Sequence, residues 1–157
     1  MKIELKKELL TAIAIPVIAG GLVGILTASS MQDFEALMKP PLSPPGWLFP
    51  VVWTILYTLM GIASYLVWRD GTGDQKKQVL TLYGLQLIVN LLWPVAFFTL
   101  EWYLFAFAWL VLLWVLIYKT IKAFREINVN AAYLMLPYLL WVTFAGYLNL
   151  SIWWLNR

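Results

Sequence analysis

The chain has 157 residues and a mass of 18.1 kDa, which is the size of one domain. Hydrophobic residues make up 62% of it, charged residues only 12%, and the net charge is +3. Water-soluble domains are nearer half apolar and a quarter charged, so this composition excludes a soluble globule, a disordered chain and a nucleic-acid-binding domain.

The chain also lacks cysteine and histidine. Without cysteine it has no disulfide and no thiolate nucleophile. Without histidine it has neither the most common general base nor the usual ligand of metals and haem. We therefore expect no obligatory cofactor and no metal site.

Runs without charged residues predict five membrane-spanning helices, because about 20 apolar residues cross the hydrocarbon core and lipid leaves no other way to satisfy the backbone. The predicted spans are 9–28, 46–68, 79–100, 102–124 and 131–155, with a first loop at 29–46. Only Glu101 separates the third span from the fourth, so we expect a tight turn at Leu100–Glu101–Trp102. The fold class is thus an all-α integral membrane protein, a five-helix bundle in one domain.

The first span has some features of a cleaved signal peptide, namely Lys6, Lys7 and a small-residue stretch at Thr27–Ser29. Its charge-free run is longer than a usual signal core, so we favour a retained helix. Gly20, Gly24 and Ala28 form a stripe that permits close helix packing. The stripe is compatible with a contact inside the bundle and with one between protomers.

The first loop is rich in proline, with five prolines between Lys39 and Trp53. Prolines limit the backbone, so this segment is stiff. It is compatible with a lid over one end of the bundle and with a rigid connector.

The predicted spans contain no charged residue near their centres, which argues against an ion-coupled transporter. Polar residues recur at helical spacing instead: Gln86 and Asn90 are four residues apart and share one helix face. Trp53 and Tyr57 have the same spacing. Trp141, Ala145 and Asn149 form a similar stripe on the last span. Buried indole N–H groups need partners, so the deep tryptophans indicate either a dense core or an aromatic-lined cavity.

Basic residues predict the orientation. Nine of the eleven lie at the N-terminus and in the second and fourth loops, and only Lys39 and Arg157 lie on the other side. The positive-inside rule then places the N-terminus in the cytoplasm of a bacterial plasma membrane, with the C-terminus across it.

Three stretches resemble the translocator protein family, also called the tryptophan-rich sensory proteins. They are KPPLSPPGWLFPVVWTILYTLMG from Lys39, QLIVNLLWPVAFF from Gln86 and PYLLWVTFAGYLNLSIWWLN from Pro137. The resemblance implies a five-helix bundle with a pocket under the first loop, a homodimer, and binding of porphyrins, haem-related tetrapyrroles, sterols or drug-like compounds. It implies that Trp53, Asn90, Trp93, Trp141, Ala145 and Leu148 form the ligand-binding pocket, and that Pro44, Pro45, Trp47 and Phe49 form the lid and mouth.

The sequence departs from the family just before the lid. Members usually have Trp-Tyr before the lid, where this chain has Asp33 and Phe34. The change removes an indole and a hydroxyl from the lid and mouth, and we expect the Asp33 carboxylate to repel anionic porphyrins there.

We therefore expect a binding or receptor protein for planar hydrophobic ligands rather than an enzyme. Its partners would be membrane lipids and a small hydrophobic ligand, with no nucleic acid. Two alternatives stay open. One is light-dependent porphyrin breakdown with Trp53 and Trp141 as candidate catalytic residues, and the other is passive carriage of a lipophilic ligand.

Overall fold

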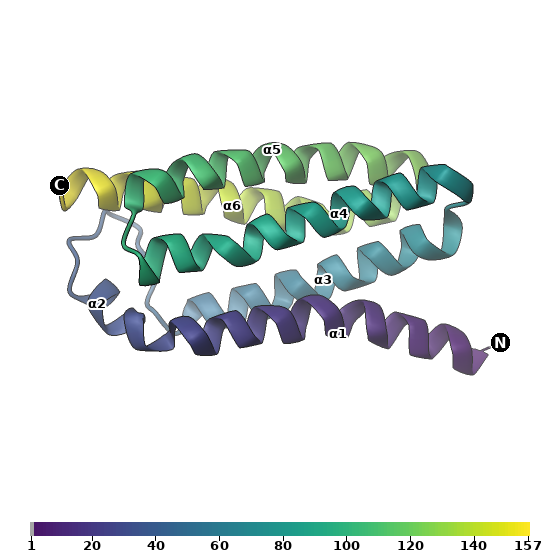
Figure 1. The fold of residues 1–157 in the computed structure, drawn as a ribbon, viewed down its shortest axis with the longest axis horizontal. Helices are drawn as coiled ribbons and strands as arrows, with labels where there is room; N and C mark the ends of the chain where they lie inside the picture. Colours follow the sequence, from purple (N-terminus) through teal and green to yellow (C-terminus); the bar gives the residue numbers. More distant parts are fainter. Residues whose placement is uncertain (1) are drawn as a thin grey trace.

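The computed structural model describes residues 2–157, and the regular structure in this range is all helical. Five helices are long and apolar enough to cross a membrane, and they lie side by side in an elongated bundle (Figure 1). They are α1 (Lys2–Thr27), α3 (Leu48–Asp70), α4 (Gly73–Pro94), α5 (Tyr103–Ile127) and α6 (Val129–Leu155). The described N- and C-terminal residues lie at opposite ends of the bundle. The predicted all-α membrane fold is confirmed.

The first helical segment runs further than expected. A 3-10 turn, η1 (Ala28–Ser30), and the short helix α2 (Met31–Glu35) continue α1, so the first loop covers 36–47 rather than 29–46. Residues 28–35 contain no glycine or proline that would end a helix. The third predicted span corresponds to α4, which begins at Gly73 rather than at 79. Its first turns are polar but remain helical outside the apolar stretch.

Proline ends α4. Pro94 has no N–H to donate, and the chain widens after it into a π turn, η2 (Val95–Thr99). The chain then reverses at Glu101, whose φ is +55°. This is the tight turn that the sequence predicts between the third and fourth spans.

The packing of the five helices is uneven. α5 packs closely on α6, while α1 packs mainly on α3 and meets α4 and η2 only weakly. Most large apolar side chains of α1 face away from the bundle and are exposed. α1 touches α3 closely at Gly61, where a Cβ atom would overlap the backbone of Ile13. Gly20 of the small-residue stripe lies against the ring of Tyr57, so this part of the stripe packs inside the bundle.

Candidate functional site

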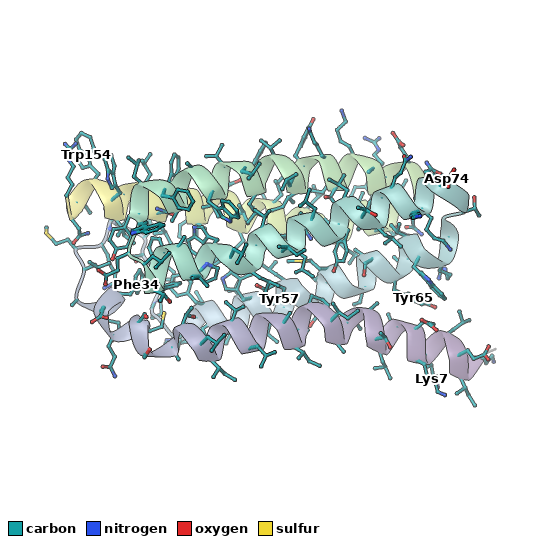
Figure 2. The ribbon with its side chains drawn as sticks, viewed as in Figure 1. Lys7, Phe34, Tyr57, Tyr65, Asp74 and Trp154 are labelled. Carbon is teal, nitrogen blue, oxygen red and sulfur yellow. The ribbon has the colours of Figure 1, made fainter. Side chains whose placement is uncertain are left out.

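A cavity of about 520 Å³ lies between α1, α3, α4 and α6, in the half of the bundle nearer the first loop. Its wall is mostly apolar and aromatic. The aromatic side chains that line it are Phe49, Trp53, Tyr57, Trp93, Phe98 and Trp141. In the view of Figure 2, Tyr57 lies near the middle of the bundle, between α1 and α4. Drug-sized ligands are bound by cavities of this volume and character.

The deep tryptophans fall into two groups. The indole N–H of Trp93 donates to Asn149 Oδ1 at 3.1 Å, that of Trp109 to the Val89 carbonyl at 2.7 Å, and that of Trp114 to Thr143 Oγ1 at 2.9 Å. Within residues 2–157, the indole N–H groups of Trp53 and Trp141 donate to no other residue. These two tryptophans both line the cavity, so their N–H groups are available to a ligand.

The rings around these two tryptophans hold them in place. Trp53 stacks on Tyr57, with ring centroids 5.5 Å apart, and meets Tyr138 edge-on at 6.2 Å. Trp141 meets Phe49 edge-on at 6.0 Å. Offset-stacked and edge-on pairs are the favoured aromatic geometries, so the cavity wall is positioned before any ligand arrives.

The predicted stripe on α6 divides between the cavity and the protein interior. Trp141 and Ala145 line the cavity, whereas Asn149 lies behind it. The Asn149 amide accepts from Trp93 and donates to the Tyr103 carbonyl at 2.7 Å. Leu148 is buried and is not among the lining residues. The cavity wall on α6 is therefore one aromatic ring and one methyl group.

Asn90, expected in the pocket, lies one layer behind its wall. Its side chain is 2% exposed, accepts from the Tyr57 hydroxyl at 2.6 Å and donates to the Tyr138 hydroxyl at 2.8 Å. The Tyr138 hydroxyl in turn donates to Gln86 Oε1 at 2.9 Å. A buried chain of polar groups thus joins α3, α4 and α6, and Tyr57 is its only member among the lining residues. Asn90 positions Tyr57 and has no free face toward the cavity.

Among the six predicted lid and mouth residues, Phe49 alone lines the cavity. Phe34 is buried at the loop end of the bundle (Figure 2), with its ring 6.0 Å from Phe49 and 5.4 Å from Phe98. Asp33 is exposed on α2, and Trp47 is 69% exposed. Pro44 and Pro45 belong to the loop and also lie outside the cavity lining.

The first loop is fastened to the end of α6. The Asn156 side chain accepts from the Met38 N–H at 3.0 Å and donates to the Met38 carbonyl at 2.9 Å. The Tyr147 hydroxyl donates to the Pro41 carbonyl at 2.9 Å. Asn156 was not predicted as a functional residue. An asparagine in the last turn of an apolar helix is the signal that points to it, because such an amide needs partners.

A second hollow of similar volume lies on the surface, beside the attached loop. It is lined by Pro40, Pro41, Tyr147, Leu150, Ser151, Trp153, Trp154 and Leu155. Pro40 and Pro41 belong to the loop, and the other six residues lie in the last part of α6, where tryptophans mark the membrane interface. The cavity inside the bundle, with convergent indole and hydroxyl groups, is the better candidate for a binding site.

Most of the cavity lining was not predicted from the sequence, and Gly24, Met31 and Phe98 are examples. Gly24 and Met31 belong to α1 and α2, and Phe98 to the π turn after Pro94. The sequence identified Gly24 only as a helix-packing position. Phe98 is the last residue of the family stretch that begins at Gln86, but it was given no role in the pocket. The glycine stripe was the available signal for α1, since a glycine that does not pack against a helix leaves space beside it.

Comparisons with known proteins agree with this architecture. The model of the TspO/MBR family matches residues 12–155. A tryptophan-rich protein TspO of Chlorobaculum tepidum is 44% identical over 126 residues, which are 78% of each chain. A TspO of the archaeon Archaeoglobus fulgidus is 37% identical over 149 residues, 94% of this chain and 96% of its own.

Similarity extends to animals. The translocator protein of Ovis aries is 37% identical over 142 residues, covering 88% of this chain and 84% of the sheep protein. The family match covers nearly all of the described bundle, including the four helices that surround the cavity. The chain is therefore an integral membrane protein that belongs to the TspO/MBR family.

Proposed function

We propose that this protein is a membrane receptor for planar hydrophobic ligands, with porphyrins and related tetrapyrroles as the principal class. The ligand would occupy the cavity between α1, α3, α4 and α6. Aromatic walls favour a flat ring by stacking, and the volume of about 520 Å³ falls in the range of small-molecule sites. A bound haem would be held by shape and stacking, since the sequence has no histidine or cysteine for axial ligation.

One observation carries the proposal: Trp53 and Trp141 have indole N–H groups that the described protein does not use, and both line the same cavity. A tryptophan in apolar surroundings usually finds a partner for its N–H, and both side chains are half-buried here. A ligand with acceptor atoms at its edge would supply that partner, while its ring system lies against the cavity's aromatic side chains.

The test is an equilibrium titration with protoporphyrin of the protein reconstituted in lipid nanodiscs. Trp141→Phe keeps an aromatic ring but removes the N–H, so it should weaken binding by about 1 kcal/mol, the net value of one hydrogen bond. Trp114→Phe is the matched control, because the Trp114 N–H is already bonded to Thr143 outside the cavity. Equal affinities for both variants and wild type would contradict the proposal.

A second function uses the same two side chains. Indoles on two walls of one cavity would also lie close to a bound, photoexcited porphyrin, which is the arrangement that light-dependent breakdown needs. Illuminating the complex in the presence of dioxygen and separating the products would distinguish a receptor, which returns intact porphyrin, from an enzyme. Flux across sealed liposomes would distinguish both from a passive carrier.

We also propose that the N-terminus faces the cytoplasm. Nine of eleven basic residues lie at that end of the bundle by the helix order, including Lys76 and Lys77 at the start of α4. Reporter fusions at the two termini should report opposite sides of the membrane.

A further inference from the structure

We propose that ligands reach the cavity sideways from the bilayer, through an opening between α1 and α3, and not from water through the first loop. The inference rests on the proposed function, because it concerns how the same cavity is filled. It assigns a role to Gly21 and Gly24 of α1, and it restricts the ligands to molecules that dissolve in the hydrocarbon region.

The loop end of the cavity is closed. No residue between 36 and 47 lines the cavity, and Asn156 and Tyr147 hold this loop against α6 through three hydrogen bonds. Beneath the loop, the buried ring of Phe34 packs among Phe49 and Phe98. A ligand arriving from this side would have to separate packed rings as well as the loop.

The exposed part of the cavity wall lies on two helices. The exposed lining residues are Gly21, Gly24 and Ile25 on α1, Ala28 in the adjoining η1, and Pro50 and Thr54 on α3. The lining residues of α4, η2 and α6 are Trp93, Pro94, Phe98, Trp141 and Ala145, and all of them are buried or half-buried. The opening therefore lies along α1 and α3.

Contacts between these two helices explain why the opening is there. α1 touches α3 closely at Gly61 and again at Gly20, where a Cβ atom would overlap the Tyr57 ring. One turn further along α1 the contact is lost, because a Cβ atom on Gly24 would meet no atom within 4 Å. Gly21 is equally free. The helices separate beyond the Gly20–Tyr57 contact, and the absence of side chains at Gly21 and Gly24 keeps the gap open.

The depth of the opening identifies the medium that it faces. Trp47 is exposed at the start of α3, where tryptophans favour the membrane interface. Thr54 lies seven residues further, about 10 Å along the helix, and so within the hydrocarbon region. No charged residue lines the opening. These features suit a flat apolar molecule dissolved in the bilayer and disfavour one confined to water.

The test compares binding kinetics of protoporphyrin in nanodiscs by stopped flow. Gly24→Leu adds a side chain in the opening at a position where the Cβ atom meets no other atom within 4 Å, and it should slow association and dissociation together, each about tenfold. Gly84→Leu is the matched control, because Gly84 of α4 is equally unobstructed but lies outside the cavity lining, and its rates should equal those of wild type. Asn156→Ala, which removes two of the three hydrogen bonds that hold the loop, should leave the association rate unchanged.

Other outcomes would overturn the inference. If Gly24→Leu leaves both rates unchanged, or speeds dissociation alone, Gly24 does not lie on the access route of the ligand. Faster association in Asn156→Ala would assign access to the loop. Gly21→Leu repeats the test at a second position if Gly24→Leu does not fold. Wild-type protein that binds no protoporphyrin at equilibrium would overturn the proposed function, and this inference with it.

Discussion

The two halves of the bundle use the same residue types in opposite ways. In the half nearer the N-terminus, Asn90, Tyr138 and Gln86 are fully buried and bonded to one another, and α1 is pressed against α3 at Gly61. In the half nearer the first loop, Trp53 and Trp141 face a cavity with unused N–H groups. Unpaired polar atoms alone do not mark a site, since Gln86 Nε2 and the Tyr83 hydroxyl are buried without a partner in the first half. The two indoles mark the candidate site because they also face a cavity.

The largest effect is expected where α1 and α3 touch. Gly61→Val forces a side chain into the backbone of Ile13, which cannot move aside cheaply, so the free energy of unfolding should fall by about 3 kcal/mol. Thermal unfolding in detergent measures the change. Gly84→Val is the control and should cost far less, since its Cβ meets no atom within 4 Å. Equal losses would mean that α1 and α3 are not in close contact.

The next effect concerns the buried polar chain. Asn90→Leu keeps the size of the side chain but leaves the Tyr57 hydroxyl without a partner and removes one of the two hydrogen bonds of the Tyr138 hydroxyl, which should lower the free energy of unfolding by about 2 kcal/mol. Trp53→Phe, in the cavity half, should change it little, because that N–H stabilises no protein contact. Reversed magnitudes would contradict the division into a bonded and an open half.

A binding effect is expected at Ala145. Ala145→Leu fills part of the cavity and should weaken protoporphyrin binding by about 1–3 kcal/mol while changing stability little. Ala108→Leu, at an exposed position on α5, is the matched control and should bind like wild type. An unchanged affinity for Ala145→Leu would show that ligand does not contact this wall.

The smallest effect belongs to Asp33. Its carboxylate is exposed and does not line the cavity, so Asp33→Asn should strengthen binding of anionic porphyrin by about 1 kcal/mol or less, and only at low salt. Binding of a neutral drug-like ligand should not change. Glu35→Gln, a neutralisation on the same short helix, should match Asp33→Asn if the effect is general charge. A gain for the neutral ligand as well would show that Asp33 acts through the conformation of α2.

The sequence predicts the five-helix fold well. Charged residues and unpaired backbone groups are costly in lipid, so each long apolar run without charge predicts one spanning helix. Boundaries are less accurate where polar residues stay helical, as in Ala28–Glu35 and at the start of α4. The turn at Glu101 is predicted correctly because one helix through it would be about twice as long as the bilayer is thick.

The candidate site is predicted in part. Helical spacing groups Trp53 with Tyr57 and Trp141 with Ala145, and these four residues share a cavity in the structure. Spacing does not distinguish a side chain on the cavity wall from one bonded behind it, and the resemblance placed Asn90 in the pocket although it lies behind the wall. That distinction depends on the tyrosines of neighbouring helices. The attachment of the loop to Asn156 also depends on tertiary contacts between distant segments.

The central claim is that the ligand takes up the unused N–H groups of the two cavity tryptophans, Trp53 and Trp141. Fluorine NMR of protein labelled with 5-fluorotryptophan tests it directly, with single Trp→Phe variants to assign the resonances. Saturating protoporphyrin should shift the signals of Trp53 and Trp141 most and leave those of Trp109 and Trp114 nearly unchanged, since these two are bonded outside the cavity. Shifts at Trp109 and Trp114 without shifts at Trp53 and Trp141 would contradict the account.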